Sequence, residues 1–523
     1  MPFPTLRDFI QHLDSNGELL RVKAPVDPAL EIAAIATRSI LQPAPHAHKE
    51  RDRSSAANVG GKALLFENVK GSSMPVAINT FGSYWRICQA LGTDSLDALA
   101  ERVQALIKPE VPTTLLDKMK RIPDLMKMAS YPPKSVRTGL CQQVVYEGDR
   151  ADLLMLPVLQ CWKLDGDLRS DQVFDREAAQ KLSGVPGYQQ NGKYFTLAGI
   201  YTRLPDGSHR NVGMYRVQVM GPRTCAIHWH MHHDGARHFR AWQKLGQKMP
   251  VAVVLGGESV LPYSATAPLP PTVEELLFAG FLNGGGIEMV KCRTLELEVP
   301  ANAEIVVEGY VDPNEKYYEG PFGDHTGFYS LADWYPRFDV TCITTRRDPI
   351  YPATVVGKPP MEDYFLGKAT ERIFLPLLKM LVPDIIDYSL PVAGCFHNGA
   401  IVKIRKEYPQ QARRVMHAIW GAGQMSFTKF IIVVDEHVDV HDDQAVLFHL
   451  FANTDPLRDV EIVKGPIDIL DHASIEYGWG GKIGFDATRK MMGEGQVRVW
   501  PRELELDDVT KALVEKRWKE YGF

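Results

Sequence analysis

The chain has 523 residues, of which 45% are hydrophobic and 24% charged, and this composition excludes disordered, collagen-like and disulfide-stapled proteins. At about 150 residues per domain, the length predicts about three domains, each large enough to bury its own core. The 59 basic and 64 acidic side chains give a net charge of -5, which gives no reason to expect nucleic acid or an anionic membrane as a partner.

Residues 1–130 predict an N-terminal α/β domain. Thr5 is a predicted helix cap, and it precedes apolar residues at helical spacing: Leu6, Phe9, Ile10 and Leu13. A polar stretch at 46–61 predicts a surface loop, and 96–107 predicts an amphipathic helix. Prolines between 109 and 133 then place the domain boundary near residue 130.

Residues 131–345 consist of short alternating runs between turn residues, which is typical of an antiparallel sheet or barrel. If 214–219 is one strand, its period of two puts Arg216 and Gln218 on the same face, opposite the apolar residues of the run. The segment 163–193 is rich in Asp, Gly, Ser and Gln, and predicts a long exposed insertion.

Residues 346–523 alternate between strands and helices, as in an α/β domain. The pattern predicts a helix at 413–420, a strand at 430–434 and a charged C-terminal helix at 508–521. The 7 cysteines are scattered and never form a C-x-x-C pair, which indicates a reducing, cytoplasmic location. No apolar run approaches about 18 residues, so we expect neither secretion nor a transmembrane segment.

Histidines crowd into residues 226–238. On a strand, His228, His230 and His232 would share one face and could converge on a metal or an anion. The alternative is a solvated, histidine-rich edge. The absence of an H-E-x-x-H motif and of a cysteine ligand set argues against structural zinc.

Two acids, Glu319 and Asp324, stand five residues apart in a Gly/Pro-rich loop at 318–327. Facing one cavity in different environments, they could serve as acid and base; the alternative is a turn with two exposed acids. Three further polar residues have similarly ordinary explanations. Glu275 stands at capping-box spacing from Thr272, while Asn211 would enter a strand and Arg216 would form a surface ion pair.

Taken together, four ordered motifs resemble the UbiD family of decarboxylases: residues 211–216, 228–238, 275–280 and 319–327. The resemblance extends from 6–9 to 486–488, nearly the whole chain. It implies a central split β-barrel that binds prenylated FMN at 131–345. An N-terminal α/β domain at 1–130 and a C-terminal α/β and oligomerisation domain at 346–523 would flank it.

The resemblance also implies roles for individual residues. A divalent metal, usually manganese, would be held against the cofactor phosphate, with potassium nearby, by Asn211, His232 and Glu275. The cofactor would be bound by Met214, Tyr215, Arg216, His228, Trp229, His230, His233, Asp234 and Lys406, with Lys406 reaching the phosphate. The catalytic trio would be Arg216, Glu319 and Asp324. His233 departs from the family pattern, since many relatives have Lys or Arg there.

The implied reaction is a reversible, non-oxidative decarboxylation of an aromatic acid. Arg216 would bind the carboxylate, Glu319 would orient Arg216, and a neutral Asp324 with a raised pKa would donate the proton. The expected substrate is a hydroxylated quinone precursor, either a polyprenyl hydroxybenzoate or a dihydroxynaphthoate, and residues 357–364 and 471–474 favour the naphthoate type. A flavin prenyltransferase would supply the cofactor, and the chain would form a homodimer or homohexamer.

Two other functions remain open at this point. One is a metal-dependent hydrolase without flavin, built on the histidine cluster with Glu319 as the base. The other is a flavin-binding protein without catalytic activity.

Overall fold

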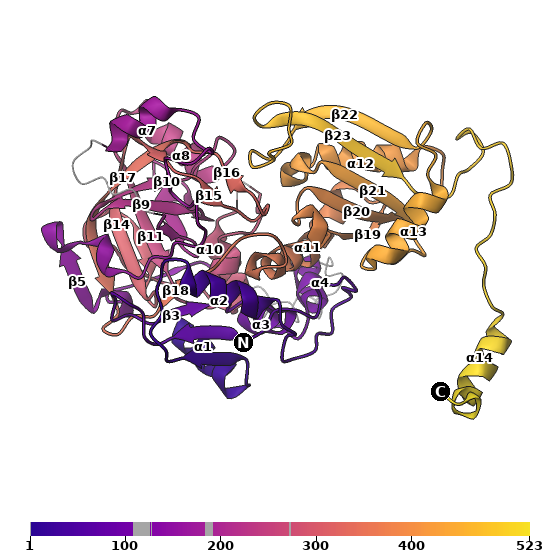
Figure 1. Ribbon diagram of the computed structural model, residues 1–523, viewed down its shortest axis with the longest axis horizontal. Helices are drawn as coiled ribbons and strands as arrows, with labels where there is room; N and C mark the ends of the chain where they lie inside the picture. The colour runs from indigo at the N-terminus through magenta and orange to yellow at the C-terminus, as the bar shows by residue number, and fades with distance from the viewer. Residues whose placement is uncertain (1, 108–125, 127, 184–191, 271–272) are drawn as a thin grey trace.

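The computed structural model describes residues 2–107, 126, 128–183, 192–270 and 273–523, and its elements gather around three main sheets. In Figure 1 the N-terminal elements lie below the large central sheet, and the C-terminal sheet lies to its right, with helix α11 (Glu362–Leu381) between them. No helix among the described residues is long and apolar enough to cross a membrane. All cysteines are unpaired, and only Cys395 is not buried.

The N-terminal part has a four-stranded sheet of β1 (Leu19–Val22), β2 (Ala63–Phe66), β3 (Val76–Ile78) and β18 (Tyr351–Ala353). Its helices are α1 (Leu6–Ser15), α2 (Glu31–Ile40), α3 (Tyr84–Leu91) and α4 (Leu96–Ile107). The cap prediction is confirmed, because Thr5 accepts a hydrogen bond from the backbone N–H of Asp8. β18 comes from beyond residue 345, so this N-terminal sheet includes a strand from the segment assigned above to the C-terminal domain.

The stretch at 46–61 is a loop, as its polarity predicted, but only part of it lies at the surface. Asp52 is buried and accepts hydrogen bonds from the hydroxyl groups of Tyr84 (2.6 Å) and Tyr364 (2.5 Å). Since Tyr364 lies on α11, this polar contact ties the N-terminal part to the helix that leads into the C-terminal sheet. Polar residues can be buried when partners satisfy them, and composition alone does not reveal those partners.

The central sheet has nine strands in the order β6-β9-β10-β17-β14-β11-β7-β8, with β5 paired to β17. They are β5 (Val144–Glu147), β6 (Tyr194–Phe195), β7 (Gly199–Arg203), β8 (Arg210–Met214), β9 (Val217–Gly221), β10 (Thr224–Ile227), β11 (Met249–Leu255), β14 (Ile305–Glu319) and β17 (Asp333–Thr345). Its ladders are antiparallel, as the alternating pattern predicted. Among the described strands, no pairing closes this path into a barrel.

The run 214–219 is not one continuous strand. β8 ends at Met214 and pairs with β7, whereas β9 begins at Val217 and pairs with β10 and β6, near the other end of the path. Three residue steps span at most about 11 Å, so the sheet must curl to bring its two ends together. Arg216 therefore lies in the link between the two ends of the curled sheet.

Smaller elements surround this sheet. One three-stranded sheet contains β4 (Lys134–Val136), β12 (Glu288–Lys291) and β13 (Glu298–Pro300), and a hairpin joins β15 (Phe322–Gly323) to β16 (Tyr329–Ser330). The helices are α7 (Arg176–Ser183), α8 (Asp234–Lys244), α9 (Leu261–Ser264) and α10 (Glu275–Asn283).

The first part of the predicted insertion at 163–193 is packed rather than exposed. Leu168 and Val173 are buried in a cluster with Tyr317, Tyr318 and other residues of the central domain. The polar composition of the segment did not predict these apolar contacts. Residues 184–191 of the insertion lie outside the part of the chain that the structure describes.

The C-terminal sheet has the order β19-β20-β21-β23-β22, and comprises β19 (Ile385–Ser389), β20 (Gly399–Ile404), β21 (Phe430–Asp435), β22 (Val460–Pro466) and β23 (Trp479–Asp486). Its helices are α12 (Gln411–Trp420) and α13 (Asp443–Asn453). The predicted helix at 413–420 and strand at 430–434 are confirmed as α12 and β21. The C-terminal helix α14 (Asp508–Arg517) is also confirmed; it extends away from the rest of the protein and has no buried residue.

Candidate active site

Arg216 and Glu319 form a buried, two-pronged ion pair. The Nε of Arg216 donates to Oε1 of Glu319 at 3.0 Å, and its second terminal nitrogen donates to Oε2 at 2.8 Å. The Arg216 side chain is 7% exposed and that of Glu319 is 0% exposed. Burial opposes the charge on Glu319, but the guanidinium of Arg216 and the ring of His228 outweigh it and lower the pKa of this carboxyl.

Asp324 binds the same guanidinium from another side. The remaining terminal nitrogen of Arg216 donates to Oδ2 of Asp324 at 2.5 Å, so one arginine bridges both acids of the loop. The other oxygen of Asp324 accepts from the backbone N–H of His325 at 2.8 Å and from the His325 ring at 2.9 Å. These contacts show that Arg216, Glu319 and Asp324 lie together, as the sequence predicted.

The charge state of Asp324 differs from the expectation. Burial raises the pKa of this carboxyl, but the hydrogen bond from His325 and the charge of Arg216 have the larger combined effect and lower it well below the ordinary value. Asp324 is thus ionised in this arrangement. The sequence pattern suggested a dry pocket beside another carboxylate and could not show that two cationic groups would contact it.

Close backbone packing holds the acidic loop in place. Gln218, in β9, accepts a hydrogen bond from the backbone N–H of Gly320 at 2.8 Å, so its predicted placement on the same side as Arg216 is confirmed. A Cβ atom on Gly320 would lie 2.5 Å from Gly166, and one on Gly323 would lie 2.1 Å from Trp162. Only glycine fits where the loop passes over this segment.

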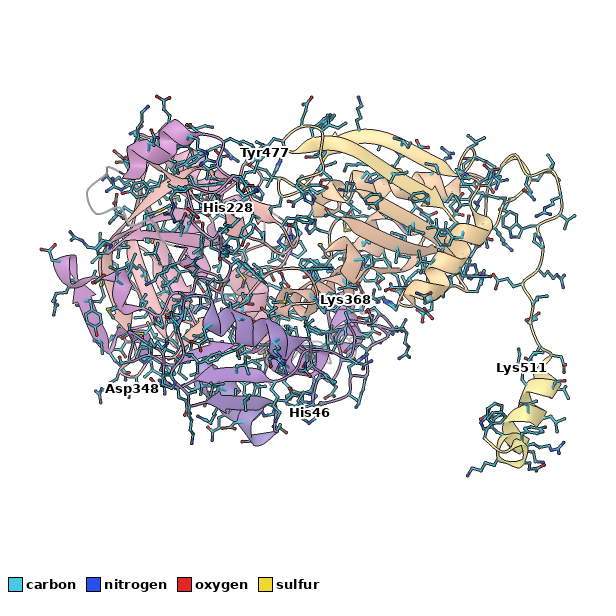
Figure 2. All side chains as sticks on the ribbon, viewed as in Figure 1. His46, His228, Asp348, Lys368, Tyr477 and Lys511 are labelled. Carbon is cyan, nitrogen blue, oxygen red and sulfur yellow. The ribbon has the colours of Figure 1, made fainter. Side chains whose placement is uncertain are left out.

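The histidines of 226–238 do not converge on one point. His228, which is buried and labelled in the central domain in Figure 2, directs its Nδ1 at Glu319 across 2.9 Å. His238 directs its Nδ1 at the hydroxyl of Thr202 across 2.9 Å. His230 and His233 pack against each other with ring centroids 3.3 Å apart. Among the described residues, no three metal-ligating side chains of this stretch meet, which disfavours a hydrolase built on it.

Buried polar atoms without a hydrogen-bond partner gather around the same stretch. They are Asn211 Nδ2, His228 Nε2, Trp229 Nε1, His230 Nδ1 and His233 Nδ1. Asp234 begins helix α8, so the positive end of a helix dipole lies beside them. Buried N–H groups normally find acceptors, and a phosphate supplies several oxygens where a helix begins. The indole N–H of Trp229 can only donate, and the ring nitrogens of His230 and His233 can donate in one tautomer. With the N-terminus of α8 they fit the phosphate-bearing cofactor that the resemblance implies.

Four other residues of the expected cofactor set lie near this stretch and make different contacts. The hydroxyl of Tyr215 accepts from the backbone N–H of Gly235 at 3.3 Å, while its ring lies 4.6 Å from that of His233. Burial and neighbouring histidines lower the pKa of His233 well below its ordinary value, so it is neutral. Met214 ends β8 beside these residues, and Asp234 pairs with Arg237 at 3.3 Å.

Two of the three expected metal ligands lie together. The side chain of Glu275 accepts from the backbone N–H of Val212, directly after Asn211, at 2.9 Å. Burial raises the pKa of Glu275 to about 7. A buried carboxylate and the side-chain amide oxygen of an asparagine are ligand types that a divalent cation takes, so Glu275 and Asn211 fit a cation. His232 fits less well, because it is exposed and its ring lies 5.1 Å from that of Phe427.

The capping-box alternative for Glu275 does not describe this helix. Glu274 is the N-cap of α10 and makes no side-chain capping bond, while Glu275 turns to β8. Thr272, the other half of the proposed box, lies outside the described residues.

The structure does not bring Lys406 to this site. Its side chain is 0% exposed, and its ammonium donates to Glu494 at 2.7 Å, Thr488 at 2.9 Å and Asp486 at 3.4 Å, all within the C-terminal part. Two carboxylates already neutralise this lysine, so in this arrangement it serves the C-terminal fold.

Sequence reasoning missed four residues around the acids. Ser330 accepts from Arg216 at 2.9 Å, and His325 contacts His397 as well as Asp324. Asp363 places a carboxyl without a hydrogen-bond partner near His325. The only available signal was that His325 follows Asp324 in the acidic loop; Ser330, Asp363 and His397 are brought in by the tertiary structure.

The family comparison matches nearly all of the chain in three parts. These are the N-terminal, Rift-related and C-terminal domains of 3-octaprenyl-4-hydroxybenzoate carboxy-lyase, at residues 10–106, 134–359 and 364–487. An uncharacterized protein of Aquifex aeolicus (strain VF5) is 45% identical over 518 residues, covering 99% of this chain and 98% of its own. An uncharacterized protein of Archaeoglobus fulgidus is 42% identical over 522 residues, with 99% of each chain covered.

Solved structures match this chain along nearly its whole length. The closed form of vanillic acid decarboxylase from Sedimentibacter hydroxybenzoicus has a TM-score of 0.80 at 25% identity and covers 100% of both chains. The open form of the same enzyme scores 0.74 at 25% identity, covering 100% of this chain and 99% of its own. HmfF from Pelotomaculum thermopropionicum, a UbiD-class enzyme in complex with prFMN, scores 0.73 at 25% identity, with 97% and 98% covered.

Proposed function

Because the chain belongs to the UbiD family of carboxy-lyases, it is a decarboxylase, and we propose that it removes the carboxyl group of an aromatic acid reversibly and without oxidation, using prenylated FMN. The observation that carries the proposal is the convergence of Arg216, Glu319 and Asp324 beside a group of unpartnered buried polar atoms. A metal site made of two carboxylates would not explain the unpartnered polar atoms. A phosphate-binding site would not explain Glu319 and Asp324.

The reaction itself explains why a cofactor is needed. Loss of carbon dioxide from an aromatic ring leaves an electron pair in an sp2 orbital that the ring cannot absorb, and no side chain offers an electron sink. Prenylated FMN supplies that sink when bound. In this chain, Trp229, His230 and His233 would hold its phosphate end with the N-terminus of α8.

Arg216 suits the binding of a substrate carboxylate. Glu319 fixes the guanidinium through two of its nitrogens, so the third side, now occupied by Asp324, is where a substrate carboxylate would approach. Phe322 lies 4.8 Å from the guanidinium and offers an aromatic wall. A third carboxylate beside one guanidinium would favour protonation of Asp324, which is the form a proton donor requires.

We also propose a divalent cation, manganese in the first instance, at Asn211 and Glu275, with potassium nearby. The support is the buried Glu275 carboxyl, which accepts a hydrogen bond from the backbone next to Asn211. His232, the third residue that the resemblance implies, would contribute only if its ring turned away from Phe427. The ion would offset phosphate charge.

The finer assignments rest on the resemblance alone. The proposed substrate is a hydroxylated quinone precursor, of the naphthoate or hydroxybenzoate type. A flavin prenyltransferase is the proposed source of the cofactor. The proposed assembly is a homodimer or homohexamer, and the proposed architecture of the curled central sheet is a split barrel.

The test is the Asp324→Asn variant, loaded with cofactor by co-production with a flavin prenyltransferase and assayed against a panel of aromatic acids. We expect turnover to fall by about 10²–10⁴-fold, because the amide supplies no acidic proton, while the absorbance of the bound flavin is unchanged. Asp348→Asn, at the exposed surface of the central domain, is the matched control and should retain full activity. A fully active Asp324→Asn enzyme would refute the assignment of the donor.

A further inference from the structure

His325 lies between the catalytic acid and the C-terminal part of the protein. Its Nδ1 is 2.9 Å from Oδ1 of Asp324, and its Nε2 is 2.7 Å from Nε2 of His397. The ring of Phe396 stacks on that of His325, with centroids 5.4 Å apart. Both ring nitrogens and one ring face are therefore engaged, and the His325 side chain is only 20% exposed.

The protonation of this chain of groups follows from its partners. Ionised Asp324 can only accept, so Nδ1 of His325 carries a proton. Two imidazole nitrogens 2.7 Å apart need one proton between them. Burial and the neighbouring His325 lower the pKa of His397 to about 4, so His397 is neutral, and Nε2 of His325 donates to it. His325 is an imidazolium that donates at both nitrogens.

Charged groups from several elements maintain this state. Burial lowers the pKa of His325, but the Asp324 bond and the carboxylates of Asp324, Asp363 and Asp468 outweigh it and raise the pKa to about 9. Asp363 faces the ring from α11, and Asp468 from the segment after β22. Arg216 lies on the far side of Asp324, and its positive charge opposes a positive charge on His325. His397 is the neutral acceptor from the C-terminal part.

The C-terminal groups reach His325 from one tight loop at residues 392–399. Cys395 and Phe396 have φ angles of 48° and 50°, in the left-handed region that side chains rarely adopt. Backbone N–H groups of His397 and Asn398 both bond to the carbonyl of Gly394. The strained backbone is held by packing, since Phe396 lies against Gly367 of α11, where a Cβ atom would come within 2.9 Å of the ring.

We propose that His325 holds the proton that Asp324 passes to the substrate, and that Phe396 and His397 of the 392–399 loop keep the His325 ring positioned for this transfer. The inference rests on the proposed decarboxylase function. His325 acts through Asp324, so it is a positioning residue and proton reserve that does not itself touch the substrate.

The proton balance is simple. The bond between the ring carbon and the carboxylate breaks, carbon dioxide leaves, and the electron pair left on carbon takes up one proton. That proton comes from Asp324, which receives it from Nδ1 of His325. One imidazolium becomes imidazole, one C–H bond forms, and solvent returns one proton to His325 before the next turnover.

The first experiment compares the loaded wild-type enzyme with His325→Gln across pH. Glutamine can still donate a hydrogen bond to Asp324 but holds no dissociable proton. We expect kcat to fall by about a hundredfold or more with little change in KM, and the alkaline decline of kcat near pH 9 to disappear. His417→Gln, on the exposed face of α12, is the matched control and should keep the wild-type profile.

A second measurement uses the protein without cofactor. A histidine pKa raised from 6.5 to about 9 stabilises the folded state below pH 6.5, and this stabilisation is lost as pH rises through 9. Urea unfolding should therefore show wild type more stable than His325→Gln near pH 6, with the difference shrinking above pH 9. His397→Phe keeps a ring but removes the acceptor, and should move the alkaline decline of kcat to lower pH.

The outcomes separate the two proposals. A wild-type enzyme that decarboxylates no aromatic acid would refute the proposed function, while the urea experiment would still test the proton on His325. An active wild type whose His325→Gln variant keeps the same kcat and alkaline decline would overturn the inference alone. A stability difference that is constant with pH would overturn it as well. An unchanged pH profile in His397→Phe would refute the part assigned to the 392–399 loop.

Discussion

At the scale of single residues, the candidate site is a small group of buried charges around one guanidinium. Glu319 is fully buried, and its charge is tolerable because Arg216 contacts both of its oxygens. A buried ion pair of this kind is weak support for stability when intact, but removal of one partner leaves an uncompensated charge. The site should therefore be sensitive to loss of Arg216 in stability as well as in activity.

Arg216→Met tests this. The variant fills similar volume but leaves Glu319 buried without a cation, so we expect the free energy of unfolding to fall by about 3–5 kcal/mol in urea titrations. Arg223→Met is the control, since Arg223 forms an exposed pair with Asp149 and should cost less than about 1 kcal/mol. Equal losses in the two variants would show that burial of Glu319 does not depend on Arg216.

At the scale of elements, the acidic loop is positioned by contacts that run across the sequence. Gln218 of β9 anchors the backbone of Gly320, and the segment at 161–166 packs under the loop where glycines permit it. The alternating pattern around Arg216 predicted the correct face for Gln218. It did not predict the break between β8 and β9. The alternation of side chains along a strand does not reveal which neighbouring strand each part of the run pairs with.

Gly323→Ala tests whether this packing positions Asp324. The added Cβ would meet the Trp162 ring at 2.1 Å, so the loop or the ring must move. We expect a loss of about 1–3 kcal/mol in stability and a fall in kcat, measured by urea unfolding and steady-state assay. Gly285→Ala places its Cβ in open space and should leave both unchanged. A Gly323→Ala enzyme with wild-type kcat would show that the loop tolerates displacement.

At the scale of the whole molecule, the C-terminal part reaches over the site of the central part. Beyond His325 and His397, the rings of Phe328 and His472 lie 4.0 Å apart, and His232 contacts Phe427. In Figure 2, Lys368 on α11 marks the connection between the two parts, and Tyr477 marks the edge of the C-terminal sheet nearest the central domain.

Helix α14 stands apart from this arrangement. None of its residues is buried, so deletion of residues 508–523 should change the free energy of unfolding by no more than about 0.5 kcal/mol at low, fixed protein concentration. Urea titration of the truncated and full-length chains gives the comparison. A loss of several kcal/mol would mean that the helix packs against protein surface in solution.

The sequence by itself determined the local elements and the residue types of the site. Thr5 was predicted as a helix cap, and the sequence pattern predicted α12 and β21. The ordered motifs predicted the family and the convergence of Arg216, Glu319 and Asp324. Such features depend on neighbours along the chain or on the order and spacing of motifs along it. Tertiary structure alone decided the charge on Asp324, the burial of Asp52, the place of Lys406 and the pairing of His325 with His397. Each of these depends on desolvation and on partners far away in sequence, because a pKa or a buried polar group is set by what surrounds it in space.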